Sequence, residues 1–167
     1  AELVEAGKIR YAGVSNFNME QLKRIQPIHP VTSLQPPYSM LRREVEEEIL
    51  PYCRENQIGI VAYSPMQAGL LTGRFSKERV QNLPANDWRK ANPFFTSPQL
   101  EANLSIIEQL RPVAARMEIT LPQLALAWVL LCGGRRGRCS CSCGWPGACK
   151  GMGMVHGAWA WAWAWAW

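Results

Sequence analysis

Residues 11–17 read Tyr11-Ala12-Gly13-Val14-Ser15-Asn16-Phe17, a short apolar run that ends in a serine and an asparagine. Residues 8–14 have the length and composition of a strand, and Asn18 opens a helical pattern, so the sequence predicts that Ser15 and Asn16 lie where a strand ends. In α/β proteins ligands bind at that edge of the sheet. The alternative is a turn that only caps the next helix, which turn preferences favour for the pair taken alone.

The same alternation of strand and helix recurs along the chain. Repeated βα units of this kind imply a parallel sheet. The predicted elements are a helix over 2–6 ended by Gly7, a strand over 8–14, a helix from Asn18 to Pro27 with Gln21 completing its capping box, a strand over 31–35 stopped by Pro36 and Pro37, a helix over 42–56 kinked or broken at Pro51, and a strand over 59–63.

The second half of the chain is more irregular. Residues 66–96 show no sustained period, and a loop of that length in a compact domain is more often functional than idle. Ser97 and Pro98 predict a helix start, with an apolar stripe that is interrupted at Pro112. Thr120 and Gln123 form a capping box for a last helix through residue 131, which is apolar on nearly every side and must be covered by protein.

Composition excludes several classes of partner. The chain has 167 residues, enough for one domain but fewer than the roughly 250 of a full α/β barrel. All 13 acidic residues precede Cys132, so residues 1–132 are nearly neutral, which argues against binding to nucleic acid or a membrane surface. Cys53 is the one cysteine before Cys132, and no signal peptide or membrane-spanning run is found, so we expect a cytoplasmic protein.

Three motifs carry a resemblance to a known family. The motifs are Gly-Lys-Ile-Arg-Tyr-Ala-Gly-Val-Ser-Asn-Phe at 7–17, Ser-Leu-Gln-Pro-Pro-Tyr-Ser at 33–39 and Ala-Tyr-Ser-Pro-Met-Gln-Ala-Gly-Leu-Leu-Thr-Gly-Arg at 62–74. In this order and spacing they resemble the aldo-keto reductases, nearest to the bacterial-type members, which are soluble NADP(H)-dependent oxidoreductases. The resemblance covers residues 1–131 and implies an α/β fold, part of a (β/α)8 TIM barrel, whose fifth, sixth and seventh strands match the three strands here.

The resemblance also implies a nicotinamide site. Ser15, Asn16 and Gln35 match the residues that hydrogen-bond the carboxamide of the cofactor NADP(H), whose one acceptor and two donor hydrogens they can satisfy. Tyr63 matches the aromatic side chain that stacks on the nicotinamide ring. Without the resemblance, Gln35 is equally typical of a hydrogen-bonding residue at a strand end, and Tyr63 of a core aromatic.

The phosphate side of the cofactor is implied by the third motif. Its small residues let backbone N–H groups approach a pyrophosphate closely. Arg74 matches a basic position that contacts phosphate in several family members, although alone it is equally typical of a solvated charge. The residues that match the pyrophosphate turn are Ser64, Met66, Ala68 and Gly69.

The function implied is the reduction of aldehydes or ketones, small carbonyl substrates, by hydride transfer. The family uses a Tyr, Lys, Asp and His for catalysis, all upstream of the segment matched here, so no catalytic residue is assigned. None of Tyr11, Tyr38, Tyr52 and His29 matches those positions. Two hypotheses follow: a fragment of a reductase that carries the nicotinamide-binding wall, or an inactive remnant that acts at most as a cofactor-binding or interaction module.

Residues 132–167 depart from the family pattern. They are rich in Cys, Gly and Arg and end in alternating Ala and Trp. The favoured interpretation is a disordered tail of low complexity that is not family sequence. A basic RNA-binding tail with Arg135, Arg136 and Arg138 between tryptophans is an alternative. Another is a metal or redox site, although the spacing lacks the paired knuckles of common zinc sites; its candidates are Cys139, Cys141, Cys143 and Cys149.

Overall fold

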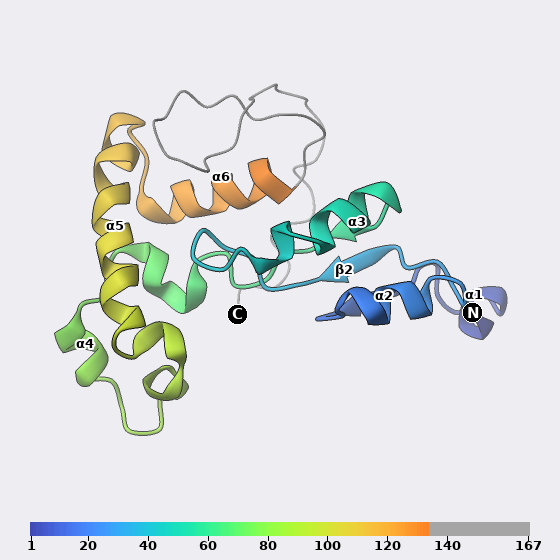
Figure 1. Cartoon of the computed structure of the whole chain (residues 1–167), viewed down its shortest axis with the longest axis horizontal. Helices are drawn as coiled ribbons and strands as arrows, with labels where there is room; N and C mark the ends of the chain where they lie inside the picture. The colour runs from blue at the N-terminus through green and yellow to red at the C-terminus, as the bar shows by residue number, and fades with distance from the viewer. Residues whose placement is uncertain (134–167) are drawn as a thin grey trace. The chain divides into compact units, whose positions relative to one another are not determined.

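The computed structural model describes residues 1–133, and Figure 1 traces their helices and strands. Three strands, β1 (Gly13–Ser15), β2 (Ser33–Gln35) and β3 (Gly59–Ile60), form one parallel sheet in the order β1-β2-β3. Ser15 lies opposite Gln35, and Leu34 lies opposite Ile60. The predicted parallel sheet of consecutive βα units is therefore confirmed.

The strands are shorter than the sequence predicts. Within the described residues β1 and β3 each have a neighbour on one side only, so the ladder extends only as far as each faces β2. Beyond β3 the chain stays paired, since Tyr63 N–H donates to the Pro36 carbonyl at 3.0 Å and Pro37 and Tyr63 form an isolated bridge. Pro36 lacks a donor, but its carbonyl still extends the pairing.

Two helices cover one face of the sheet. They are α2 (Met19–Ile25) and α3 (Ile49–Glu55), while the short α1 (Glu2–Glu5) precedes β1. Leu22 of α2, Cys53 of α3 and Leu34 of β2 pack in one buried cluster. The capping box at the start of α2 is confirmed, because Asn18 Oδ1 accepts from the Gln21 amide and Gln21 Oε1 accepts from the Asn18 amide, both at 2.9 Å.

The single helix predicted over residues 42–56 is wrong. The structure has a 3-10 turn, η1 (Glu44–Glu46), followed by α3. Pro51 is the third residue of α3, within the first turn, where backbone amides have no helical partner. Pro51 therefore marks the beginning of a helix and kinks nothing.

The region predicted as irregular, residues 66–96, contains four short helices. These are η2 (Gln67–Thr72), α4 (Lys77–Gln81), η3 (Trp88–Ala91) and η4 (Pro93–Phe95). None is long enough to show a hydrophobic period in sequence. Residues of η2, α4 and η4 share a core with α5 (Gln99–Arg116) and α6 (Leu121–Gly133) that includes Leu71, Phe95, Ile107 and Ala125, and η3 lies against α4 and η4.

Helix α5 differs from its prediction at two prolines. It begins at Gln99 with Pro98 at the N-cap, one residue later than predicted, and Ser97 Oγ donates to the Glu101 carboxylate instead of capping the backbone. Pro112 lies inside the helix, which continues to Arg116. Leu110 and Ala114 on either side are buried in the core, and that burial outweighs the hydrogen bond that Pro112 cannot donate.

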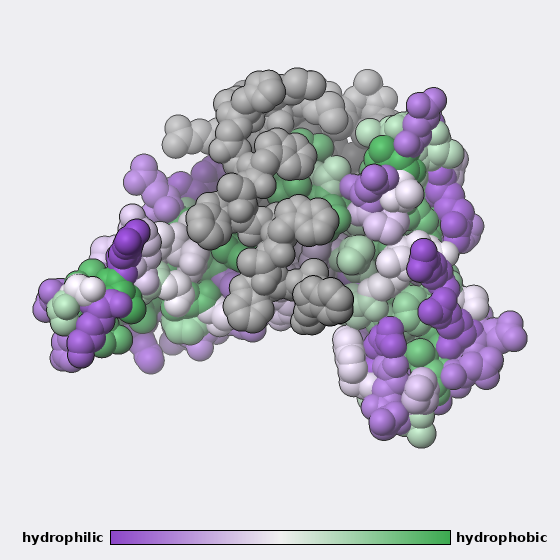
Figure 2. Space-filling model, turned by 180° about the vertical axis from the view of Figure 1, so that it is seen from behind, coloured by the Kyte–Doolittle hydropathy of each residue, from purple (hydrophilic) through white to green (hydrophobic). Residues whose placement is uncertain are grey.

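The capping box of α6 is confirmed, with Gln123 Oε1 accepting from the Thr120 amide at 2.8 Å. The predicted cover of α6 is only partial. Ala125 and Val129 are buried, but Leu126 is 42% exposed and Leu130 is 62% exposed. Figure 2 shows the hydrophobic residues on one face of the molecule in green and the hydrophilic ones in purple. One face of α6 is thus without cover in the described part of the chain.

Among residues 1–133, no single helix is long and apolar enough to cross a membrane; α5 and α6 meet that test of length and composition only as a pair, bent by 90° between them.

Helix α6 runs through Cys132 to Gly133, two residues beyond its predicted end. The remaining predictions for the tail, including the cysteine site, the basic RNA-binding segment and the disorder, concern residues outside those that the structure describes.

Candidate functional site

The three strand ends meet at the carboxyl edge of the sheet. Ser15 and Gln35 are direct partners in the register of β1 and β2, and Tyr63 pairs with Pro37 just beyond β2 and β3. Because the strands are parallel and adjacent, residues that follow each strand lie along one edge. The structure therefore brings together Ser15, Asn16, Gln35 and Tyr63, which the sequence predicts to share a site.

The Gln35 carbonyl joins β1 to β2 at this edge. It accepts the Asn16 amide at 3.0 Å and the Ser15 hydroxyl at 3.1 Å. Ser15 Oγ has thereby donated its only hydrogen and is left as an acceptor. Within the described residues the exposed side-chain amide of Gln35 has no hydrogen-bond partner, so its donors and acceptor are available to a ligand.

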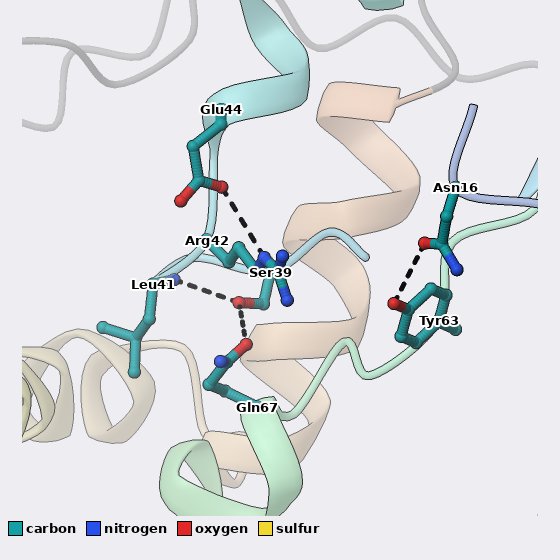
Figure 3. Close-up of polar contacts among 7 residues, drawn as sticks. All are labelled: Asn16, Ser39, Leu41, Arg42, Glu44, Tyr63 and Gln67. Carbon is teal, nitrogen blue, oxygen red and sulfur yellow. Dashed lines mark hydrogen bonds and ion pairs between the residues drawn. The ribbon is translucent and has the colours of Figure 1, made fainter. Parts of the chain in front are cut away.

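Asn16 has a left-handed backbone, with φ of 58°. Asparagine tolerates this conformation better than most residues, so the local turn also favours Asn here. Its side chain reaches across the site, where Tyr63 Oη donates to Asn16 Oδ1 at 3.1 Å (Figure 3). The end of β1 is thus tied to the chain that follows β3.

A shallow depression of about 260 Å³ lies on the sheet face opposite the helices. Ser15 and Gln35 line it together with Gly13, Val14, Ser33 and Val61. Gly13 keeps this surface open, because a Cβ there would collide with Ser33 Oγ and approach the Ser33 carbonyl oxygen to 3.2 Å. Two of the residues predicted to bind the carboxamide, Ser15 and Gln35, therefore border an open and partly polar surface.

The turn after Tyr63 is built from left-handed residues. Ser64, Gln67, Ala68 and Gly69 have φ of 53°, 47°, 52° and 97°. The Gly69 amide donates to the Met66 carbonyl at 3.1 Å, so this amide is used within the turn. A Cβ at Gly69 would also lie 3.2 Å from the Phe75 ring. The left-handed backbone and the contact with Phe75 therefore each favour glycine at position 69. Both reasons are independent of the predicted approach of this residue to a pyrophosphate.

Arg74 follows this turn and is exposed. Among the described residues its guanidinium has no ion-pair partner, whereas its carbonyl accepts from Arg79 Nη1 at 3.2 Å. The guanidinium of Arg74 is therefore available to an anionic ligand, as far as the described residues are concerned.

Two interactions in this region were missed by sequence reasoning. Ser39 Oγ donates to Gln67 Oε1 at 3.0 Å in the interior (Figure 3). Tyr38 Oη donates to Glu46 Oε1 at 2.8 Å. Burial and then this hydrogen bond raise the pKa of Tyr38, which makes its phenol a weaker acid. No sequence pattern signals either pair.

Within the described residues, the side chains gathered at the strand ends are a hydroxyl, two amides and a phenol, which offer hydrogen-bond donors and acceptors. His29 precedes β2 and so lies toward the amino edge of the sheet. No group of three or more potential metal ligands occurs in residues 1–133. The arrangement suits recognition of a neutral polar group such as a carboxamide.

Comparison with known proteins identifies the family. The model of the Aldo/keto reductase family matches residues 1–135. The chain belongs to the aldo-keto reductase family. A curated relative, the probable aldo-keto reductase 1 of Glycine max, is 43% identical over 129 residues, which are 77% of this chain and 36% of that protein.

Solved aldo-keto reductase structures are similar to this chain. The glycerol dehydrogenase AKR11B4 from Gluconobacter oxydans is 33% identical with a TM-score of 0.73, over 79% of this chain and 40% of that one. An aldo/keto reductase from Klebsiella pneumoniae in complex with NADP and acetate is 25% identical with a TM-score of 0.51, over 77% of this chain and 37% of that one. The small parallel sheet is consistent with part of a barrel, and the chain spans well under half the length of these relatives.

Proposed function

We propose that this chain supplies the nicotinamide-binding wall of an NADP(H)-dependent aldo-keto reductase that reduces aldehydes or ketones. The observation that carries the proposal is the convergence of Ser15, Asn16, Gln35 and Tyr63 at one sheet edge. Membership of the family supports the same assignment. The cofactor, when bound, supplies the hydride that reduces the carbonyl carbon.

The chain's own residues bind and orient the cofactor. Asn16 and Gln35 present side-chain amides, and Ser15 presents an acceptor oxygen, so a carboxamide's carbonyl and its two N–H groups can all be paired. Fixing the carboxamide fixes which face of its ring meets the substrate. The Tyr63 ring supplies the surface on which the nicotinamide stacks.

The turn of Ser64, Met66, Ala68 and Gly69 and the charge of Arg74 are proposed to hold the phosphates. Ala68 and Gly69 carry little or no side chain, so the chain of this turn can approach a phosphate closely. Under this proposal the groups that protonate the substrate belong to the part of the family fold that this chain does not span, since the chain covers 36% of its curated relative.

Binding of NADPH to the purified chain tests the proposal. We expect quenching of tryptophan fluorescence at micromolar to millimolar NADPH, and a several-fold weaker affinity in Gln35→Ala because a hydrogen bond to the carboxamide is lost. Gln81→Ala, an exposed glutamine in α4, is the matched control and should bind as the unaltered chain does. No binding at millimolar NADPH would contradict the proposal.

Activity of the chain tests the hypothesis that it is an inactive remnant. Consumption of NADPH with a panel of aldehydes and ketones is expected to be absent, because no described residue matches the catalytic Tyr, Lys, Asp or His of the family. Carbonyl reduction by the chain alone would show that the catalytic groups are present after all. Binding without reduction is the result that the proposal expects of the chain by itself.

A further inference from the structure

The hydrogen bond from Tyr63 Oη to Asn16 Oδ1 spans the width of the candidate site. Asn16 follows β1 and Tyr63 continues β3, which are separated in the sheet by β2. The two residues are 47 positions apart in the sequence, so no local turn requires the contact. Figure 3 shows the phenol and the amide pointing toward each other.

The direction of this bond determines which end of the Asn16 amide faces a ligand. A phenol is a better donor than acceptor, because its oxygen lone pair is delocalised into the ring. The hydroxyl of Tyr63 therefore engages Oδ1 and leaves Nδ2, which has no partner among the described residues. The backbone amide of Asn16 is already bonded to the Gln35 carbonyl. Asn16 thus presents a donor alone.

Ser15 beside it presents the opposite polarity. Its hydroxyl hydrogen is committed to the Gln35 carbonyl at 3.1 Å, so Oγ can only accept from a ligand. A donor from Asn16 and an acceptor from Ser15 therefore stand on adjacent residues. A primary carboxamide has the complementary pair, a carbonyl oxygen and an N–H group on one carbon.

We propose that the Tyr63 hydroxyl is a positioning group that locks the Asn16 amide with Nδ2 toward the ligand, so that the site recognises a carboxamide oxygen in one orientation. The inference rests on the proposed cofactor site and adds to the stacking role of the Tyr63 ring. Removing the hydroxyl frees the Asn16 amide to turn. The site then discriminates less between a strong and a weak hydrogen-bond acceptor opposite Asn16.

The test compares two cofactors in variants that keep the aromatic ring. The ligands are NADP and its thionicotinamide analogue, in which a weakly accepting sulfur replaces the carboxamide oxygen while the amino group stays. The variants are Tyr63→Phe and the control Tyr11→Phe, since Tyr11 is 73% exposed and has no hydrogen bond among the described residues. Dissociation constants are measured by calorimetry on the full chain. Adenosine 2',5'-bisphosphate serves as a ligand that lacks the nicotinamide ring.

We expect the unaltered chain to bind NADP more tightly than the thio analogue, and the ratio of the two dissociation constants to fall by about fivefold in Tyr63→Phe, the worth of one typical hydrogen bond. Tyr11→Phe should keep the original ratio. Affinity for adenosine 2',5'-bisphosphate should be the same in all three proteins, which shows that the fold and the phosphate side are intact.

A purely stacking or structural role of Tyr63 predicts something different. It would weaken NADP and the thio analogue by the same factor, leaving their ratio unchanged, and that result would overturn the inference while leaving the proposed function intact. Failure of the unaltered chain to bind either cofactor would overturn the proposed function and this inference with it.

Discussion

Ser39 and Gln67 are joined by a buried hydrogen bond of 3.0 Å, and Gln67 is held in a left-handed backbone conformation with φ of 47°. Ser39 Oγ also accepts from the Leu41 amide at 3.2 Å. One hydroxyl therefore connects the loop after β2 to η2, within the turn that we propose to hold the phosphates. The position of that turn depends on a residue far from it in sequence.

Ser39→Ala is expected to destabilise the chain by about 1–3 kcal/mol, because the buried Gln67 side chain loses its donor and the Leu41 amide its acceptor. The free energy of unfolding in urea measures the change. Ser105→Ala on the exposed side of α5 is the control and should change stability by less than about 0.5 kcal/mol. Equal stability of the two variants would show that the Ser39 hydroxyl is dispensable.

Gly13→Ala is expected to destabilise the sheet by about 1–3 kcal/mol through overpacking, since its Cβ collides with Ser33 Oγ. Adding Ser33→Gly should recover part of the loss, leaving the approach to the residue 33 carbonyl oxygen at 3.2 Å. Gly59→Ala in the same sheet is the control, because its Cβ would meet only the Thr32 carbonyl oxygen at an ordinary 3.4 Å. Thermal denaturation followed by circular dichroism distinguishes them. No rescue by Ser33→Gly would refute the steric cause.

Asp87 gives the chain part of its acid sensitivity. Hydrogen bonds from the Arg89 side chain, then from its backbone amide, hold the pKa of Asp87 at about 2, below its usual value of 3.8. A depressed carboxylate pKa contributes stability that is present above the unfolded pKa and lost as pH falls toward the folded pKa. We therefore expect stability to fall from about pH 4 to about pH 2.

The variant Asp87→Asn should show a shallower loss across that window, measured as the urea midpoint at pH 5, 4, 3 and 2. The control Glu78→Gln removes an exposed carboxylate of α4 and should keep the slope of the unaltered chain. If Asp87→Asn has the same slope as that control, the Asp87–Arg89 pair does not contribute to acid sensitivity.

Cys53 should resist alkylation in the folded chain. It is 1% exposed, and burial raises the pKa of its thiol to about 11, so at pH 8 little thiolate exists and access is blocked. We expect iodoacetamide to label the Cys53 peptide at pH 8 only after unfolding in urea, as read by mass spectrometry. Labelling at equal rates with and without urea would mean that the cluster around Leu22 and Leu34 does not form.

Local signals in the sequence predicted many of the elements. The capping boxes at Asn18 and at Thr120 were found because both partners lie within one turn of each other. The sequence did not predict that α5 continues through Pro112 or that the chain breaks before α3, because each feature depends on burial against other elements. Three of the four short helices of residues 66–96 contribute to the core shared with α5 and α6, and all four are too short to show a hydrophobic period.

The sequence by itself determined the family and the parallel order of the βα units. It also placed Ser15, Asn16, Gln35 and Tyr63 at strand ends, because strand ends and turns depend on residues that are adjacent in the sequence. Only the tertiary structure decided how these side chains bond. Strand register places Ser15 against Gln35, and the Tyr63 hydroxyl reaches Asn16 across β2. Such contacts depend on the packing of α2 and α3 against the sheet, which fixes the distances between residues far apart in the chain.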